Sequence, residues 1–154
     1  MQTIKFYSIN DEYGAFSNFA PYPIVVNKER WKSSEHYFQA MKFESVKYKK
    51  IVKNANTPME SAIKGRSRKE KIKRNWDKIK DNVMYDAVYA KFSQHPSLQE
   101  LLLSTGDAKI VEDTITDNYW GNGADGKGQN RLGTILMRVR ENLKKSEVSE
   151  IFKK

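Results

Sequence analysis

The sequence WKSSEHYFQAMKF, residues 31–43, predicts a short helix that begins near Ser33 and organises the fold around it. Aromatic and other apolar side chains occupy most of its circumference, which is typical of a largely buried helix. At 100° per residue, Glu35, Gln39 and Lys42 nevertheless fall within roughly 60° of one another on one face. A buried carboxylate or ammonium is unfavourable unless it is paired or faces a cavity. This polar face therefore indicates either a functional site or a structural network of hydrogen bonds.

The segments on either side of this helix predict a single, mostly helical α+β domain with a small β-sheet, spanning residues 1–154. Strand-forming residues at 3–9 and 22–27 predict two early strands, which we expect to pair with each other. A third strand is expected within residues 108–115.

Helix signals occur throughout the remainder of the chain. Capping-box spacings that begin at Thr57 and at Ser97 predict two helix starts. Apolar residues recur at steps of three and four over residues 76–90, which predicts a long amphipathic helix. Gly106 is expected to end the helix that precedes it, and residues 131–145 predict a closing helix with one apolar side.

The composition of the 154 residues restricts the classes of function. No apolar run is long enough for a signal peptide, or for a bilayer span of roughly 20 residues, so we expect a cytoplasmic protein. The absence of cysteine excludes disulfides, thiolate nucleophiles and cysteine-ligated metal sites. The net charge of +9 favours an anionic partner, such as nucleic acid or a phosphorylated metabolite.

Much of this positive charge lies in KGRSRKEKIKRNWDKIK, residues 64–80, where nine Lys and Arg residues are offset by Glu70 and Asp77 alone. One interpretation is a solvated helix face and loop. The other is a surface that binds phosphate groups. The sequence leaves both open.

The segment TDNYWGNGADGKGQN, residues 116–130, is too rich in Gly, Asn and Asp for regular structure. Its glycines, beginning at Gly121, match G-x-G-x-x-G, but no apolar strand precedes them, so a dinucleotide site is not expected. A Walker A motif is not expected either, because Gly128 replaces the required Ser or Thr. Converging backbone N–H groups, together with the helix that opens near Asn130, would still suit a phosphate or a ribose.

Two loops also carry aromatic and polar residues suited to a planar ligand. Phe16, Ser17 and Asn18 combine a stacking surface with groups that could read the edge of a ring, and Trp120 offers another aromatic face. Each aromatic residue has core packing as its alternative. Asp125 either contributes a carboxylate to the site or forms the turn before the next glycine.

Five motifs occur along the chain: YGAFSNF, WKSSEHYFQAMKF, KGR, NWDKIKDNVM and LLLSTGDAKIVEDTITDNYWGNGADGKGQNRLGTILMRVR. In this order they resemble the NADAR family, over the range from Phe6 to about Leu143. Lys32 departs from the family pattern, which has proline after the tryptophan of the helix motif, but it lies outside the polar face. The resemblance implies a single-domain α+β N-glycosidase that needs no metal and no cofactor.

The resemblance implies two substrate classes. One comprises phosphoribosyl-aminopyrimidine intermediates of riboflavin synthesis, and the other is ADP-ribose attached to guanine in nucleic acid. Both contain a ribose joined through C1 to the amine of a ring. We expect the first class, with the guanine-directed ADP-ribosylhydrolase as the alternative and a non-catalytic ADP-ribose or nucleotide binding module as a second alternative. The oligomeric state is left open.

For this chemistry we expect Glu35 to act at the anomeric carbon as a general acid/base or by stabilising positive charge. The resemblance makes Lys42 the best match for a lysine that attacks C1 of an open-chain ribose. Lys64 and Arg66 would hold phosphate. The expected catalytic residues are Glu35, Lys42 and Asp125. The expected substrate-binding residues are Phe16, Ser17, Asn18, Trp31, Gln39, Lys64, Arg66, Trp76, Trp120, Gly121, Gly123 and Asn130.

Overall fold

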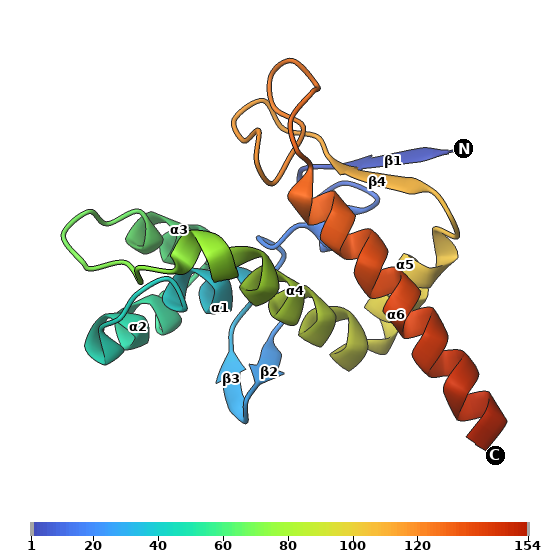
Figure 1. The fold of residues 1–154 in the computed structure, drawn as a ribbon, viewed down its shortest axis with the longest axis horizontal. Helices are drawn as coiled ribbons and strands as arrows, with labels where there is room; N and C mark the ends of the chain where they lie inside the picture. Colours follow the sequence, from blue (N-terminus) through green and yellow to red (C-terminus); the bar gives the residue numbers. More distant parts are fainter. Residues whose placement is uncertain (1, 154) are drawn as a thin grey trace. The chain divides into compact units, whose positions relative to one another are not determined.

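A computed structural model describes residues 2–153 of the chain, with side chains for residues 2–150. This part of the chain contains six α-helices and two small two-stranded sheets, so the predicted mostly helical α+β architecture is confirmed (Figure 1). Its contacts separate two compact units. One unit is Asn18–Lys91, and the other combines the residues up to Ser17 with those from Phe92 onward.

In the unit Asn18–Lys91, a hairpin leads into a group of helices. Strands β2 (Ile24–Val26) and β3 (Glu29–Trp31) are antiparallel, with Ile24 opposite Trp31. The helices that follow are α1 (Ser34–Ala40), α2 (Val46–Lys53), α3 (Pro58–Gly65) and most of α4 (Trp76–Gln94). Helix α1 packs against both α2 and α3, which places it at the centre of this unit.

The start of α1 follows from its sequence. Ser33 is extended, and its hydroxyl accepts the backbone N–H of His36, which makes Ser33 the N-cap. The Ser33 hydroxyl also lies 2.6 Å from His36 Nδ1, while His36 Nε2 lies 2.9 Å from the carbonyl oxygen of Ala55. His36 is fully buried, and burial lowers its pKa. It therefore fastens α1 to the end of α2 as a structural residue.

In the second unit, β1 (Thr3–Phe6) and β4 (Lys109–Glu112) form a parallel pair, with Ile4 opposite Ile110. The other elements are the short 3-10 helix η1 (Gly14–Phe16), α5 (Pro96–Ser104) and α6 (Arg131–Lys153). Helix α6 packs against β4 and α5. The predicted apolar side of α6 is confirmed by its buried residues: Leu132, Ile135, Leu136, Val139 and Leu143.

Two local predictions are wrong. The early strands do not pair with each other, because β1 pairs with β4 and β2 pairs with β3. The capping box at Ser97 is also absent, since α5 begins one residue earlier, with Pro96 in its first turn and His95 as the N-cap. The box at Thr57 is confirmed, because the Thr57 hydroxyl accepts the N–H of Glu60. Among the described residues, each helix is too short or too polar to cross a membrane.

Candidate active site

Helix α1 carries a carboxylate and a carboxamide that are held together. Glu35 is 6 % exposed, and Gln39, one turn further along, donates from Nε2 to Glu35 Oε1 at 2.7 Å. The oxygen of the same carboxamide, Gln39 Oε1, is buried and has no hydrogen-bond partner. The amide therefore fixes the orientation of the Glu35 carboxylate within the helix bundle.

Lys42 does not lie on the helix that carries Glu35 and Gln39. Helix α1 ends at Ala40, so Lys42 follows in a turn, and its prediction as part of a continuous helical face is wrong. Its side chain reaches α3 instead, where Nζ donates to the carbonyl oxygen of Gly65 at 2.8 Å. Its backbone carbonyl accepts the N–H of Lys73 at 3.0 Å. Lys42 is thus fixed through both its backbone and its side chain.

The electrostatic environment of Lys42 lowers the proton affinity of its amine. Burial is the largest cause of the lowered pKa, followed by the positive charge of Arg68. The Glu35 carboxylate opposes this change and is close enough for its charge to raise the Lys42 pKa. An amine in this environment loses its proton more readily than an exposed lysine does.

The basic segment 64–80 is attached to the chain next to Lys42. Phe43 and Ile72 form an isolated antiparallel bridge next to the Lys42–Lys73 hydrogen bond. At the start of the segment, Tyr48 donates its hydroxyl hydrogen to the Lys64 carbonyl at 2.6 Å. The side chain of Lys64 is half-buried and that of Arg66 is exposed. The predicted role of these two side chains in phosphate binding stays a prediction.

Three further predicted residues of this unit are buried in its interior. Trp31 is 4 % exposed and packs edge-to-face on Tyr37. Trp76 begins α4, is 8 % exposed and lies against Phe38, with ring centroids 5.1 Å apart. Asn18 is buried, and its Oδ1 accepts the Ser34 hydroxyl at 2.8 Å, beside the first turn of α1. These are packing and hydrogen-bond contacts within the protein. That these residues bind a substrate stays a prediction.

In the other unit, the loop between β4 and α6 is held by its own side chains (orange in Figure 1). Asp117 Oδ1 accepts the N–H groups of Tyr119 and Trp120, both at 2.9 Å. The rings of Tyr119 and Trp120 pack edge-to-face, and Trp120 is partly exposed. Trp120 therefore presents an ordered aromatic surface.

The glycines of this loop are required for close packing as well as for turning. A Cβ on Gly121 would lie 2.4 Å from Thr114 Cγ2. Gly123 has φ +70°, a conformation that favours glycine, and a Cβ there would lie 2.9 Å from the Cβ of Asn118. These contacts explain both residues structurally, and their predicted contact with an anion is untested.

Asn130 and Asp125 also have structural partners. Asn130, at φ +50°, donates from Nδ2 to Ile110 O and accepts the Glu112 N–H at Oδ1, so it ties the start of α6 to β4. Asp125 is exposed, and its Oδ1 accepts the Lys127 N–H at 2.9 Å in a turn. The turn-forming interpretation of Asp125 thus has a visible contact, and its catalytic interpretation stays a prediction.

Phe16 and Ser17 close the N-terminal part of this unit. Phe16 is 1 % exposed and packs edge-to-face against Phe6 and Phe92, so it is a core side chain. Ser17 is buried in extended backbone after η1. Nothing in the surroundings of Phe16 supports the predicted stacking role.

The predicted site residues are accordingly grouped by unit. The unit Asn18–Lys91 contains Asn18, Trp31, Glu35, Gln39, Lys42, Lys64, Arg66 and Trp76. The other contains Phe16, Ser17, Trp120, Gly121, Gly123, Asp125 and Asn130. Within the first unit, Gln39 is hydrogen-bonded to Glu35, and the charge of Glu35 acts on Lys42.

Two further residues of the first unit, Gly65 and Lys91, were not predicted from the sequence. Gly65 contacts both Gln39 and Lys42, and its sequence signal is its place in the KGR motif, at the start of the basic segment. Lys91 is fully buried on α4, with its Nζ 5.7 Å from the centre of the Tyr22 ring. Its place among the apolar residues that end α4 could have indicated this burial.

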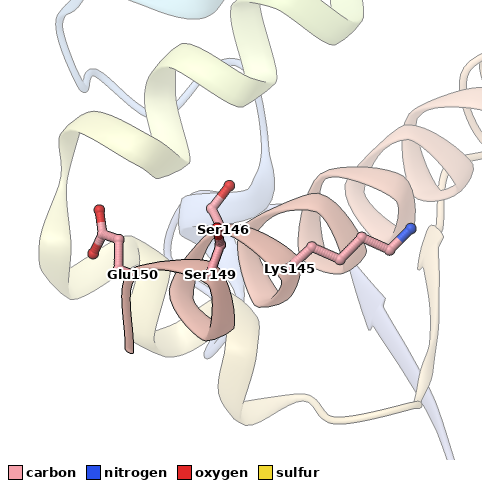
Figure 2. A pocket seen from close by; sticks show the side chains of 4 residues that line it. All are labelled: Lys145, Ser146, Ser149 and Glu150. Carbon is pink, nitrogen blue, oxygen red and sulfur yellow. The ribbon is translucent and has the colours of Figure 1, made fainter. Parts of the chain in front are cut away.

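One surface hollow is lined by Lys145, Ser146, Ser149 and Glu150, whose side chains extend from the last turns of α6 (Figure 2). All four side chains are exposed and belong to a single helix. Among the described residues, no group of three or more His, Asp or Glu side chains is arranged to hold a metal ion.

The fold and this site define the class of protein: an α+β domain with a buried glutamate held by a glutamine, and a nearby lysine of lowered pKa. Residues 5–144 match the NADAR domain. The chain is 51 % identical over 140 residues to N-glycosidase YbiA of Escherichia coli (strain K12), covering 91 % of this chain and 88 % of that protein. The NMR structure of the E. coli protein YbiA superimposes with a TM-score of 0.90 and 48 % identity, covering 96 % of this chain and 88 % of that one.

A more distant relative is the riboflavin biosynthesis protein PYRR of Zea mays, described as chloroplastic. It is 39 % identical over 155 residues, covering 91 % of this chain and 25 % of that protein. The match to the domain and the similarity to the bacterial protein together show the family of this chain. The chain belongs to the NADAR family, as its sequence motifs predict.

Proposed function

We propose that this chain, an N-glycosidase of the NADAR family, hydrolyses the bond between C1 of a phosphorylated ribose and the amine of an aminopyrimidine. Riboflavin biosynthesis intermediates are the substrates we favour. The support for this choice is the similarity to the maize riboflavin biosynthesis protein, of which the chain matches a quarter.

The observation that carries the proposed chemistry is the geometry around Glu35. A carboxylate that is 6 % exposed, and held by the Gln39 amide at 2.7 Å, cannot reorient freely. Such a preorganised negative charge stabilises an oxocarbenium-like ribose without reorganisation at the moment of reaction.

In this reaction the C1–N bond breaks and a water oxygen forms a bond to C1. The amine of the ring leaves with the proton that it needs to become neutral. Glu35 either takes the proton from the attacking water or balances the positive charge that develops at C1. The overall change is hydrolysis, with ribose phosphate and the free amine as products.

Lys42 is proposed as the second catalytic group. Its lowered pKa increases the fraction of neutral amine, which is the form that attacks an electrophilic carbon. Attack on C1 of an open-chain ribose would displace the ring amine, and water would then release the sugar from Lys42.

The test is hydrolysis of a ribosylaminopyrimidine 5′-phosphate by the wild type, Glu35→Gln and Lys42→Met. We expect fast cleavage by the wild type and a loss of about 10²–10⁴-fold for Glu35→Gln, the usual range for a general acid or base. Lys47→Met, on the exposed side of α2, is the matched lysine control and is expected to cleave at the wild-type rate. Wild-type rates in both site variants would contradict the assignment.

A second candidate is removal of ADP-ribose from guanine in nucleic acid, and the basic segment 64–80 favours it. Several of its charged side chains are exposed, including Arg66, Arg68 and Lys69. Backbone pairing at Phe43 and Ile72 attaches this segment beside Lys42. A polynucleotide bound near Lys42 would therefore meet several cations.

Salt separates the two candidates. Contacts with many phosphates release many counterions, so cleavage of an oligonucleotide carrying ADP-ribosyl-guanine should fall steeply between low and moderate salt. A small phosphorylated substrate makes one or two such contacts and should respond weakly. Cleavage of neither substrate by the wild type would favour a non-catalytic binding module.

A further inference from the structure

We propose that Gly65 is a positioning residue of this site, which fixes Gln39 through its missing side chain and Lys42 through its carbonyl oxygen. The inference rests on the proposed function for its activity measurement. It deepens that proposal, because it explains how a residue outside α1 orients both predicted catalytic groups.

The first observation is steric. A Cβ on Gly65 would lie 2.0 Å from Gln39 Oε1 and 2.6 Å from Gln39 Cδ, far inside ordinary contact distances. The carboxamide of Gln39 thus occupies the space that any other residue at this position would fill. Since Gln39 Nε2 donates to Glu35 Oε1, a displaced carboxamide would release the Glu35 carboxylate.

The second observation concerns the carbonyl group of the same residue. Gly65 O accepts the Lys42 Nζ hydrogen at 2.8 Å, at the C-terminal end of α3. A cation is favoured at the C-terminus of a helix, where the last carbonyl groups lack partners within the helix. Gly65 therefore contacts both Gln39, which holds Glu35, and Lys42 itself.

Backbone conformation does not account for a glycine at this position. The described glycines with positive φ are Gly106, Gly123 and Gly126, and Gly65 is helical as the last residue of α3. Helix propensity alone favours alanine over glycine within a helix. The close approach of Gln39 is the feature that requires glycine.

The contact partner also predicts how a variant would behave. The atoms nearest to the added Cβ belong to the flexible end of Gln39, which can move away without unfolding the helix. The next contact, 3.1 Å to Gln39 Cβ, requires only a small shift between α1 and α3. Gly65→Ala should consequently fold and retain most of its thermal stability while it misplaces Gln39.

The experiment is a double-mutant cycle with Gly65→Ala, Gln39→Ala and the pair together, on the ribosylaminopyrimidine phosphate. We expect Gly65→Ala to lower kcat by about ten- to a hundredfold, with KM changed by less than about threefold, because the reacting groups are misplaced. In the Gln39→Ala background the same substitution should have little further effect on kcat. Equal factors in both backgrounds, or an unchanged kcat in Gly65→Ala, would overturn the proposal.

A second readout does not depend on activity. The side-chain NH₂ resonances of Gln39 can be identified by their loss in Gln39→Ala. Gly65→Ala should shift them, whereas Ile63→Ala, an exposed change on the same helix, should leave them in place. Unshifted resonances in Gly65→Ala would contradict the inference. If the wild type cleaved no substrate but the resonances moved as expected, the positioning role would stand and the proposed function would fail.

Discussion

Lys42 Nζ donates a hydrogen bond to the carbonyl oxygen of Gly65, 2.8 Å away at the end of α3, and the Lys42 backbone carbonyl accepts the N–H of Lys73. These two bonds connect Lys42 to Gly65, where α3 ends, and to Lys73, near the other end of the loop between α3 and α4. Lys42 itself lies outside α1, which ends at Ala40. The position of this amine is consequently a property of the tertiary structure.

The pH dependence of the reaction should reveal the state of Lys42. Its pKa is lowered mainly by burial, so the neutral amine becomes available at a lower pH than in an exposed lysine. If Lys42 attacks C1, kcat should rise with pH through this lowered pKa and level off above it. Kinetics from pH 6 to 10 would test this expectation, and Lys42→Arg should lose both the activity and the rise. A rise that survives in Lys42→Arg would assign it to another group.

Replacement of Glu35 should separate catalysis from stability. In Glu35→Gln the buried carboxylate becomes an amide of similar size, so we expect the midpoint of thermal unfolding to change by only a few degrees. The kcat on the preferred substrate should still fall by about 10²–10⁴-fold. Calorimetry and steady-state kinetics on the same preparation would measure both quantities. If the fraction of folded protein fell by as much as the activity, Glu35 would instead be a structural residue.

The sequence predicted the polar face of α1 correctly for the two residues that lie within one turn of each other. Glu35 is buried and Gln39 is half-buried on a helix that starts after Ser33, as the helical periodicity indicated. The prediction failed for Lys42, because a local pattern does not show where a seven-residue helix ends. The bridge between Phe43 and Ile72, which attaches the basic segment next to Lys42, joins residues that are distant in the sequence.

The same limit applies to strand pairing and to packing. β1 pairs with β4, which lies far from it in the sequence, although the strand-forming segment at 22–27 is much nearer. The requirement for glycine at position 65 depends on Gln39, which lies on another helix. The family resemblance correctly gave the family and the mostly helical α+β class, since both are encoded in motifs spread over the chain.

Asn130 should contribute to stability through its side chain and its backbone. Its carboxamide bonds to Ile110 O and to the Glu112 N–H, both on β4, and its φ of +50° is unfavourable for most residues. We expect Asn130→Ala to lower the free energy of unfolding by about 2–4 kcal/mol, from two lost hydrogen bonds and the backbone strain. Asn130→Gly loses the same bonds without the strain and should be less damaging. Urea unfolding of both variants measures this difference. An equal loss of unfolding free energy in the two variants would mean that backbone strain contributes nothing.

The buried amine of Lys91 should make stability depend on pH in the alkaline range. Lys91 is 0 % exposed, and burial lowers its pKa from 10.5 to about 7. Between these two values the unfolded chain binds a proton that the folded chain lacks, so the free energy of unfolding rises with pH across this window. Each pH unit within this window contributes at most about 1.4 kcal/mol. The free energy of unfolding should therefore increase by on the order of 3 kcal/mol between pH 7 and 9.5.

Lys91→Met is the matched comparison for this dependence, because it retains a long unbranched side chain and removes the titrating group. We expect the wild type to gain stability relative to Lys91→Met as the pH is raised from 7 to 9.5, and we expect this gain in urea unfolding at each pH. The other titrating groups are common to both proteins, so the difference between the two curves isolates Lys91. Parallel curves would mean that the Lys91 amine has the same pKa in the folded and unfolded chains, in conflict with its burial.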